Sequence, residues 1–97
     1  DVLIRAREMV ASFDRLPEEP WTSENSEGKA VSWNNKSATR RCVGHCIKNA
    51  AAKRGVEDLD AHFAFLRSAE HIKLSNRDAV LEAIDKAISM AQEYAGL

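Results

Sequence analysis

The residues of this chain that are best suited to chemistry are its two cysteines and three histidines. Cys42, His45 and Cys46 stand together in the segment C-V-G-H-C, and His62 and His71 follow further along. Zinc is usually held by four Cys or His side chains, so the candidate metal ligands are Cys42, Cys46, His62 and His71. A structural zinc site normally begins with a C-x-x-C turn, however, whereas cysteines at i and i+4 on one helix face fit two buried core thiols. We therefore expect no metal site and no cofactor.

A catalytic Cys–His pair is the other chemistry that these residues suggest. His45 adjoins Cys46, but adjacent residues of a helix do not face each other. A reactive thiolate needs partial exposure in positive surroundings, and an apolar helix face predicts burial instead. We assign no catalytic residue and expect a protein that is not an enzyme. A small enzyme or a metal- or ligand-binding domain that uses Cys42, His45 and Cys46 is the alternative hypothesis.

The composition is that of one modest globular domain. The chain has 97 residues, of which 44% are apolar and 30% charged, which is enough for a single hydrophobic core. Its formal net charge of -1 gives no overall field that would attract nucleic acid. No apolar run approaches the roughly 18 residues of a membrane-spanning helix. The amphipathic start does not resemble a signal peptide, and two buried thiols suit a reducing compartment. We expect a cytoplasmic protein with no membrane and no nucleic-acid partner.

The segment that carries the cysteines predicts the central helix of the fold. On a period of about 3.6 residues its small and apolar residues fall on one face: Cys42, Val43, Cys46, Ile47 and Ala50. Its polar residues fall on the other face: Arg40, Arg41, His45, Lys48 and Asn49. We expect the helix to begin after a cap at Asn34, Asn35 or Ser37 and to end at Gly55, which suits the left-handed position behind a helix. The apolar face should be buried and the basic residues exposed.

Three further helices are predicted around it. The helical spacing of apolar residues indicates one helix over residues 2–13, one over 57–69 and one from Ser75 to about Tyr94. The 57–69 helix carries an apolar stripe, with Val56 and Phe65 beside it: Leu59, Phe63, Leu66 and Ala69. The last helix has the clearest stripe: Val80, Leu81, Ile84, Ala87 and Ile88. We therefore predict a single all-α domain over residues 1–97, a compact four-helix domain with a long irregular loop.

The predicted irregular loop, residues 14–36, separates the first two helices and holds both tryptophans. Ordering it costs about 1–2 kcal/mol per residue in backbone entropy, so something must hold it against the helices. Trp21 and Trp33 have the apolar surface to do so, and Gly44 would leave a notch for a ring on the central helix. We expect Trp21 to pack near Gly44. Residues 29–33 alternate like a strand, so a short hairpin within the loop is the alternative.

The two tryptophans and the basic helix face are candidates for an interaction surface: Trp21, Trp33, Arg40, Arg41, His45 and Lys48. Exposed tryptophans would form a binding patch, and basic side chains on one face can meet phosphates or an acidic partner. The basic face can equally be an ordinary solvated surface, or it can pair with the acidic residues of segment 18–27. No helix-turn-helix pattern supports DNA recognition. The partner that we expect is an unidentified protein or a second copy of the chain.

Three features of the chain resemble a small family of bacterial and phage proteins known only as a domain of unknown function. They are an N-terminal helix that leads to Trp21, a helix with Cys42, Gly44 and Ile47, and a last helix with the pattern V-L…I-D-x-A-I. The family usually has alanine where this chain has His45, and often has W-N-D where this chain reads L-S-N before the last helix. The resemblance implies no activity. We expect a non-enzymatic interaction or accessory domain, with a phage-related role as one option.

Overall fold

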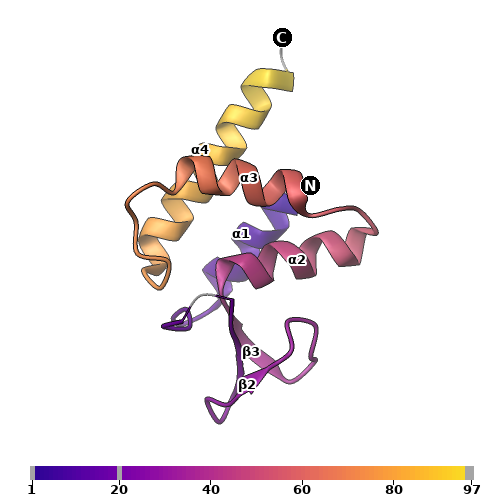
Figure 1. Ribbon diagram of the computed structural model, residues 1–97, viewed down its shortest axis with the longest axis vertical. Coiled ribbons are helices and arrows are strands. Elements are labelled where there is room, and N and C mark those ends of the chain that lie inside the picture. The colour runs from indigo at the N-terminus through magenta and orange to yellow at the C-terminus, as the bar shows by residue number, and fades with distance from the viewer. Residues whose placement is uncertain (1, 20, 96–97) are drawn as a thin grey trace.

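The computed structural model describes residues 2–19 and 21–95, and this part of the chain forms four helices and a small antiparallel sheet (Figure 1). The helices are α1 (Val2–Ser12), α2 (Val43–Arg54), α3 (Leu59–Ser68) and α4 (Arg77–Ala95). The strands are β1 (Ser23–Asn25), β2 (Ala30–Val31) and β3 (Ala38–Arg41). The predicted all-α class is therefore wrong. The domain is mixed, because a three-stranded antiparallel sheet lies between α1 and α2.

The sheet has the order β2–β1–β3, and both strand pairs are antiparallel. Its strands are only two to four residues long, and β1 reads Ser-Glu-Asn, which has no apolar alternation. Asn25 closes the β1–β2 hairpin, because its Oδ1 accepts the backbone N–H groups of Glu27 and Lys29 at 3.0 Å each. Gly28 supplies the left-handed position in this turn, with a φ of 79°. The hairpin that the sequence offered as an alternative is thus present, and β3 extends it.

Strand β3 occupies residues that the sequence assigned to the start of the central helix. α2 begins at Val43 and Cys42 is its N-cap, with the Sγ atom accepting the backbone N–H of His45 at 3.4 Å. The caps predicted at residues 34, 35 and 37 are therefore wrong. The predicted end is confirmed, because Gly55 adopts the left-handed conformation with a φ of 68°.

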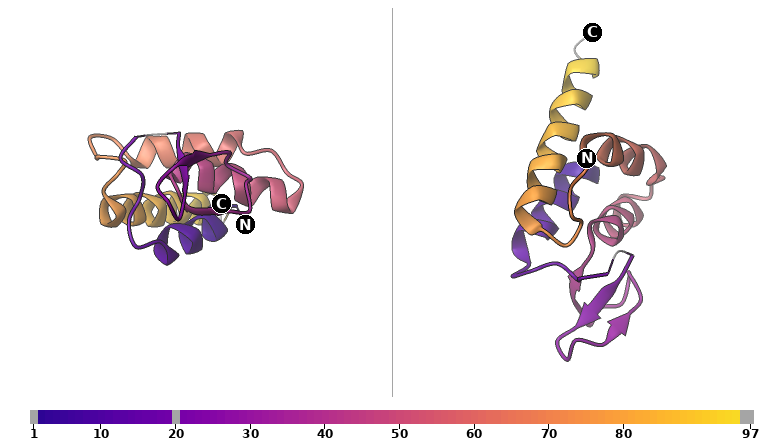
Figure 2. Two further views of the ribbon diagram at one scale, coloured as in Figure 1. Left: turned by 90° about the horizontal axis from the view of Figure 1, so that it is seen from below. Right: turned by 60° about the vertical axis from the view of Figure 1, so that its left-hand side comes forward.

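The core lies between α1, α2 and α4, and α1 packs against both of the others. Figure 2 shows α1 and α4 side by side, with α2 and α3 forming the rest of the helical body. The predicted buried face at α2 is confirmed, with exposed fractions of at most 3%: Cys42, Cys46, Ile47 and Ala50. In α4, Val80, Ile84 and Ala87 are also buried. Leu81 and Ile88 are partly buried and pack against this core.

The chain after α1 is anchored by a leucine rather than by its tryptophans. Leu16 is 1% exposed and belongs to the core cluster, whereas Trp21 is 61% exposed. Complete burial of a leucine side chain contributes about 1.5–3 kcal/mol. Leu16 and the backbone pairing of the sheet therefore hold the segment that the two indoles were expected to hold.

Helix α4 has 19 residues, and its C-terminal end extends past the other helices (Figure 1). Asn76 precedes the helix and caps it, since the Asn76 Oδ1 accepts the backbone N–H of Ala79 at 3.1 Å. Residues 89–93 of the extending end are exposed. Among the described helices, α4 included, none is both long and apolar enough to cross a membrane.

A hydrogen bond between the side chains of Ser23 and His45 joins the sheet to α2. Ser23 Oγ in β1 and His45 Nδ1 in α2 are 2.8 Å apart, and Ser23 is fully buried. Burial lowers the pKa of the His45 imidazole, and the positive charges of Lys48 and Arg41 lower it further. His45 is therefore neutral at pH 7, so that the hydrogen bond to Ser23 is made without burying a charge.

Acidification should weaken the fold through His45. Its pKa is lower in the folded protein than the value of about 6.5 in an unfolded chain, so below about pH 6.5 the unfolded state binds the proton first and the free energy of unfolding falls. Urea denaturation at about pH 7.5 and 5.5 should show this loss. His45→Gln keeps a polar partner for Ser23 but cannot titrate, so it should lose less stability over the same window. Equal losses in the two proteins, which share His62 and His71, would contradict this role.

Candidate functional site

The Cys–His segment does not form a reactive site. Cys42 and Cys46 are free thiols with exposed fractions of 3% and 0%. The Cys46 thiol donates to the carbonyl oxygen of Arg41 at 3.7 Å, and burial raises its pKa to about 12. The thiolate is the nucleophilic form of cysteine, and the raised pKa keeps the Cys46 thiol protonated near neutral pH. His45 directs its Nδ1 to Ser23, whose burial in turn keeps that hydroxyl away from any substrate.

The four candidate metal ligands, Cys42, Cys46, His62 and His71, are not gathered at one point of the structure. His62 in α3 has its Nε2 3.0 Å from Oδ2 of Asp58, and His71 is exposed between α3 and α4. Cys42 and His62 line one small cavity. Within residues 2–19 and 21–95, however, no three Cys, His, Asp or Glu side chains are grouped so that they could hold a metal ion.

The residues of the candidate basic surface contact different partners within the chain. Arg40 is the first of these residues. It lies in β3, with Nε and Nη2 donating to the two carboxylate oxygens of Asp14 at 3.0 and 3.2 Å. Its Nη1 is also 3.7 Å from a carboxylate oxygen of Glu24, within the acidic segment that the sequence offered as an internal partner. These hydrogen bonds lower the pKa of Asp14. Arg40 is partly buried, not exposed as expected, and it ties the sheet to the end of α1.

Trp33, Arg41 and Lys48 form a second group, where the β2–β3 connection meets α2. Arg41 donates from Nε to the carbonyl oxygen of Trp33 at 2.8 Å and from Nη2 to that of Asn35 at 3.2 Å. The Lys48 Nζ is 5.2 Å from the centre of a Trp33 ring, a cation–π distance. Lys48 is exposed as expected, while Arg41 is partly buried. These contacts close the connection onto α2, and we assign them a structural role.

Trp21 has a left-handed backbone conformation, which is unfavourable for a tryptophan and must be stabilised by neighbouring contacts. Its φ is 59°, in the left-handed region that residues other than glycine rarely adopt. The edge of the indole lies on Gly44 in the first turn of α2, so closely that an added Cβ would be 2.6 Å from the indole Cζ3. The rings of His45 and His62 flank it, with centroids 6.2 and 5.5 Å away. The predicted packing of Trp21 near Gly44 is confirmed, and yet the residue is 61% exposed.

A small apolar cavity connects the indole to α3. It holds about 70 Å³ and is lined by residues from α2, α3 and their surroundings: Trp21, Cys42, Val43, Gly44, His62, Phe65, Leu66 and Leu74. Three of these residues belong to α3, namely His62, Phe65 and Leu66. Trp21 and α3 are therefore neighbours on the surface, although they lie far apart in the sequence.

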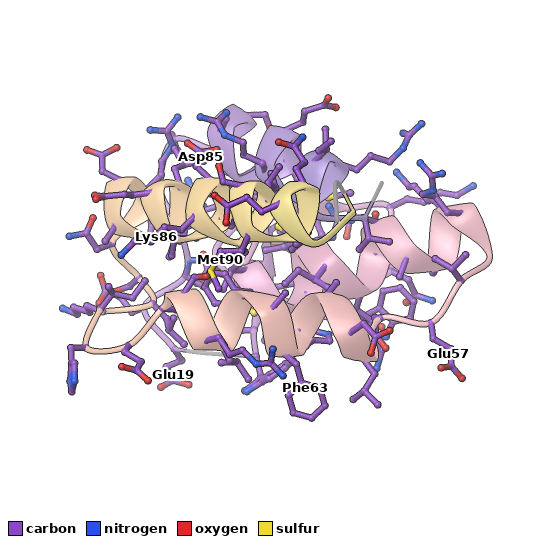
Figure 3. The ribbon with its side chains drawn as sticks, turned by 90° about the horizontal axis from the view of Figure 1, so that it is seen from above. Glu19, Glu57, Phe63, Asp85, Lys86 and Met90 are labelled. Carbon is purple, nitrogen blue, oxygen red and sulfur yellow. The ribbon has the colours of Figure 1, made fainter. Side chains whose placement is uncertain are left out.

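Helix α3 turns most of its large apolar side chains to solvent. Phe65 is 3% exposed and anchors the helix, whereas Leu59, Phe63 and Leu66 are 55%, 52% and 52% exposed. Phe65 follows Phe63 by two positions, which at about 100° per residue places it on the opposite side of the helix. In Figure 3, Phe63 points away from the rest of the domain. The stripe that apolar spacing would assign to the core is therefore an outer face.

Trp21 and this stripe make one exposed apolar surface, which we call the Trp21–α3 surface. Its members are each more than half exposed: Trp21, Val56, Leu59, Phe63 and Leu66. The sequence analysis named Trp21 as a candidate but missed the α3 residues. A signal was present, because α3 also carries Ala61, Ala64 and Phe65, which form a second apolar face. A helix with two apolar faces can bury one and leave the other for a partner.

The two thiols should be unreactive in the folded protein. Because both are buried and the Cys46 pKa is raised, a thiol-specific disulfide reagent should react with Cys42 and Cys46 far more slowly in buffer than in urea. The urea-unfolded sample is the control and should release two equivalents, one for each free cysteine. If either thiol of the folded protein reacted at the unfolded rate, the enzyme hypothesis built on Cys42, His45 and Cys46 would regain support.

Gly44→Ala should displace the Trp21 ring without unfolding α2. The new methyl group would lie at 2.6 Å from the far end of the indole, so the ring must move outward. Alanine also favours a helix over glycine by about 1 kcal/mol, so the melting temperature need not fall. Nuclear Overhauser contacts between the Trp21 ring and position 44 should disappear, and iodide quenching should increase. Ala52→Ser, on the exposed side of α2, is the matched control and should preserve the contact.

Comparison with known proteins gives no relative, since no family model, no curated protein and no solved structure matches this chain. The resemblance to bacterial and phage proteins of unknown function stays a prediction, and the function is inferred from the geometry of the molecule.

Proposed function

We propose that this protein is a non-enzymatic interaction domain that binds a helical segment of a partner protein through the Trp21–α3 surface. The observation that carries the proposal is the exposure of Leu59, Phe63 and Leu66, all more than half exposed on one side of a helix anchored by Phe65. Contiguous apolar patches of this size on a small domain mark interaction sites, whereas single exposed apolar residues do not.

The surface has enough apolar area to support binding. Complete burial of one large apolar side chain contributes about 1.5–3 kcal/mol, so covering the exposed halves of five such side chains contributes roughly 4–8 kcal/mol. A micromolar complex needs about 8 kcal/mol after the costs of ordering both partners. Polar contacts at the rim would add the remainder. The proposal is therefore for a partner bound with modest affinity.

Trp21 suits the centre of such a contact. Tryptophan is among the residues that contribute most to binding at interfaces. Here the Gly44 backbone and the rings of His45 and His62 hold the indole in place before a partner arrives. Strained backbone conformations such as that of Trp21 tend to occur at functional sites. A side chain that is already fixed loses little conformational entropy on binding.

The alternative hypothesis, a small enzyme or ligand-binding domain, has less support from the same residues. Cys42 and Cys46 are buried, His45 is paired with a buried serine, and the cavity under Trp21 is apolar. The free thiols favour a reducing cytoplasm, and the family resemblance favours an accessory role in a bacterium or phage. The proposal includes no membrane and no nucleic-acid partner.

Capture experiments with matched surface variants test the proposal. Three tagged proteins would each be used to capture partners from an extract of the source organism after chemical crosslinking. They are the unmodified protein and the variants Phe63→Ser and Ile4→Ser. Phe63 and Ile4 are exposed at 52% and 40% on different helices, so both variants should fold, which circular dichroism checks. A partner retained by Ile4→Ser and lost from Phe63→Ser is the expected result. Equal capture by both variants would place the binding surface elsewhere.

A further inference from the structure

The exposed apolar residues of α3 have the spacing of a coiled-coil seam. Leu59, Phe63 and Leu66 follow one another at intervals of four and three positions, and Val56 lies three positions before Leu59, outside the helix. Apolar residues at such alternating intervals allow two helices to pack by inserting side chains of one into holes of the other. The seam is on the outer side of the domain, where Figure 3 shows Phe63 directed away from the other elements. A helix is therefore the partner shape that the seam fits.

The charges beside the seam indicate which helix this is. Asp60 and Arg67 are seven positions apart, so they lie on the same flank of the seam, one near each end of α3. Both are exposed, and both border the groove between α3 and α4. Among the residues that the structure describes, neither has an ion-pair partner within the chain. The flank thus offers one negative and one positive charge to whatever packs against the seam.

We propose, building on the function proposed above, that the occupant of the Trp21–α3 surface is a second copy of this chain, bound with its α3 antiparallel. In antiparallel helix pairs, equivalent flank positions of the two helices face each other. Asp60 then faces the partner's Arg67, and Arg67 faces the partner's Asp60, so one two-fold axis forms both ion pairs. In the same register Phe63 packs beside the partner's Leu66. In a parallel pairing this flank would instead face the opposite flank of the partner, so neither Asp60–Arg67 ion pair would form.

The apolar area of the surface sets the strength that this dimer can have. Aromatic side chains offer about 150–250 Å² each, so Trp21 and Phe63 together expose roughly 250 Å². The three aliphatic residues enlarge this patch, but it stays below the roughly 800 Å² per partner of a standard interface. The dimer should therefore be weak, and its population should depend on protein concentration.

Charge reversal at Asp60 and Arg67 tests the proposal by sedimentation equilibrium over a range of protein concentrations. The unmodified protein should dimerise reversibly, and Phe63→Ser should remain monomeric. Asp60→Arg and Arg67→Asp should each weaken the dimer roughly tenfold, since each change turns both ion pairs into like-charge contacts. Arg5→Asp, a charge reversal at an exposed residue of α1, is the matched control and should leave the association unchanged.

Mixing the two weakened variants gives the decisive measurement. An equimolar mixture of Asp60→Arg and Arg67→Asp should associate about as well as the unmodified protein, because each pair then joins one acidic flank to one basic flank. Circular dichroism melting should show that both variants are folded. A protein that stays monomeric at every concentration, or a mixture that does not recover, would overturn the second-copy proposal. The capture experiment tests the proposed function separately. If the protein is monomeric but Phe63→Ser loses a captured partner, the second-copy proposal fails while the interaction-domain proposal stands.

Discussion

The arrangement of the whole domain depends on how the chain enters α2. The backbone N–H of Cys42 donates to the carbonyl oxygen of Thr22 at 2.9 Å, and the neighbouring Ser23 shares a hydrogen bond with His45. These contacts fix the start of β1 against the first turn of the helix. Trp21 immediately precedes Thr22 and Ser23, and these contacts bring its ring across Gly44. The position of the exposed indole thus follows from the hydrogen bonds of the two residues after it, and the small residue at position 44 leaves room for the ring.

The parts of the fold that could be predicted are those with long apolar periodicity. The bounds of α1 and α4 and the buried face at Cys46 and Ile47 follow from side-chain spacing, because several turns of helix average over local exceptions. The sheet could not be predicted in this way. Its strands are too short to show a period, and the turns depend on side chains such as Asn25 acting in place of backbone groups. Four residues of β3 directly before the α2 cap read equally well as the first turn of a helix.

The candidate site shows a different limit of sequence-based prediction. Periodicity identifies an apolar stripe but does not tell whether the stripe faces the core or the solvent. α3 has one stripe of large residues and one face with Phe65 among small residues, and the second face is the one that packs toward the core. Small residues let neighbouring elements approach closely, and interiors are packed at high density. Which face of α3 packs against the core therefore depends on the shape of the space beside α4. The local sequence of α3 does not determine that shape.

The same choice leaves α3 weakly held. Phe65 is the only residue of α3 that is buried, and the residue at its N-terminal cap, Asp58, makes no capping hydrogen bond because its carboxylate is engaged with His62. Elements with few buried contacts and incomplete caps open at lower free energy than the rest of a domain. A partner that covers Leu59, Phe63 and Leu66 would bind the formed helix and not the opened one, and so would stabilise it by mass action. Binding at this surface and the order of α3 are therefore coupled. The exposed residues that leave α3 with low stability are also the ones through which a partner would stabilise it.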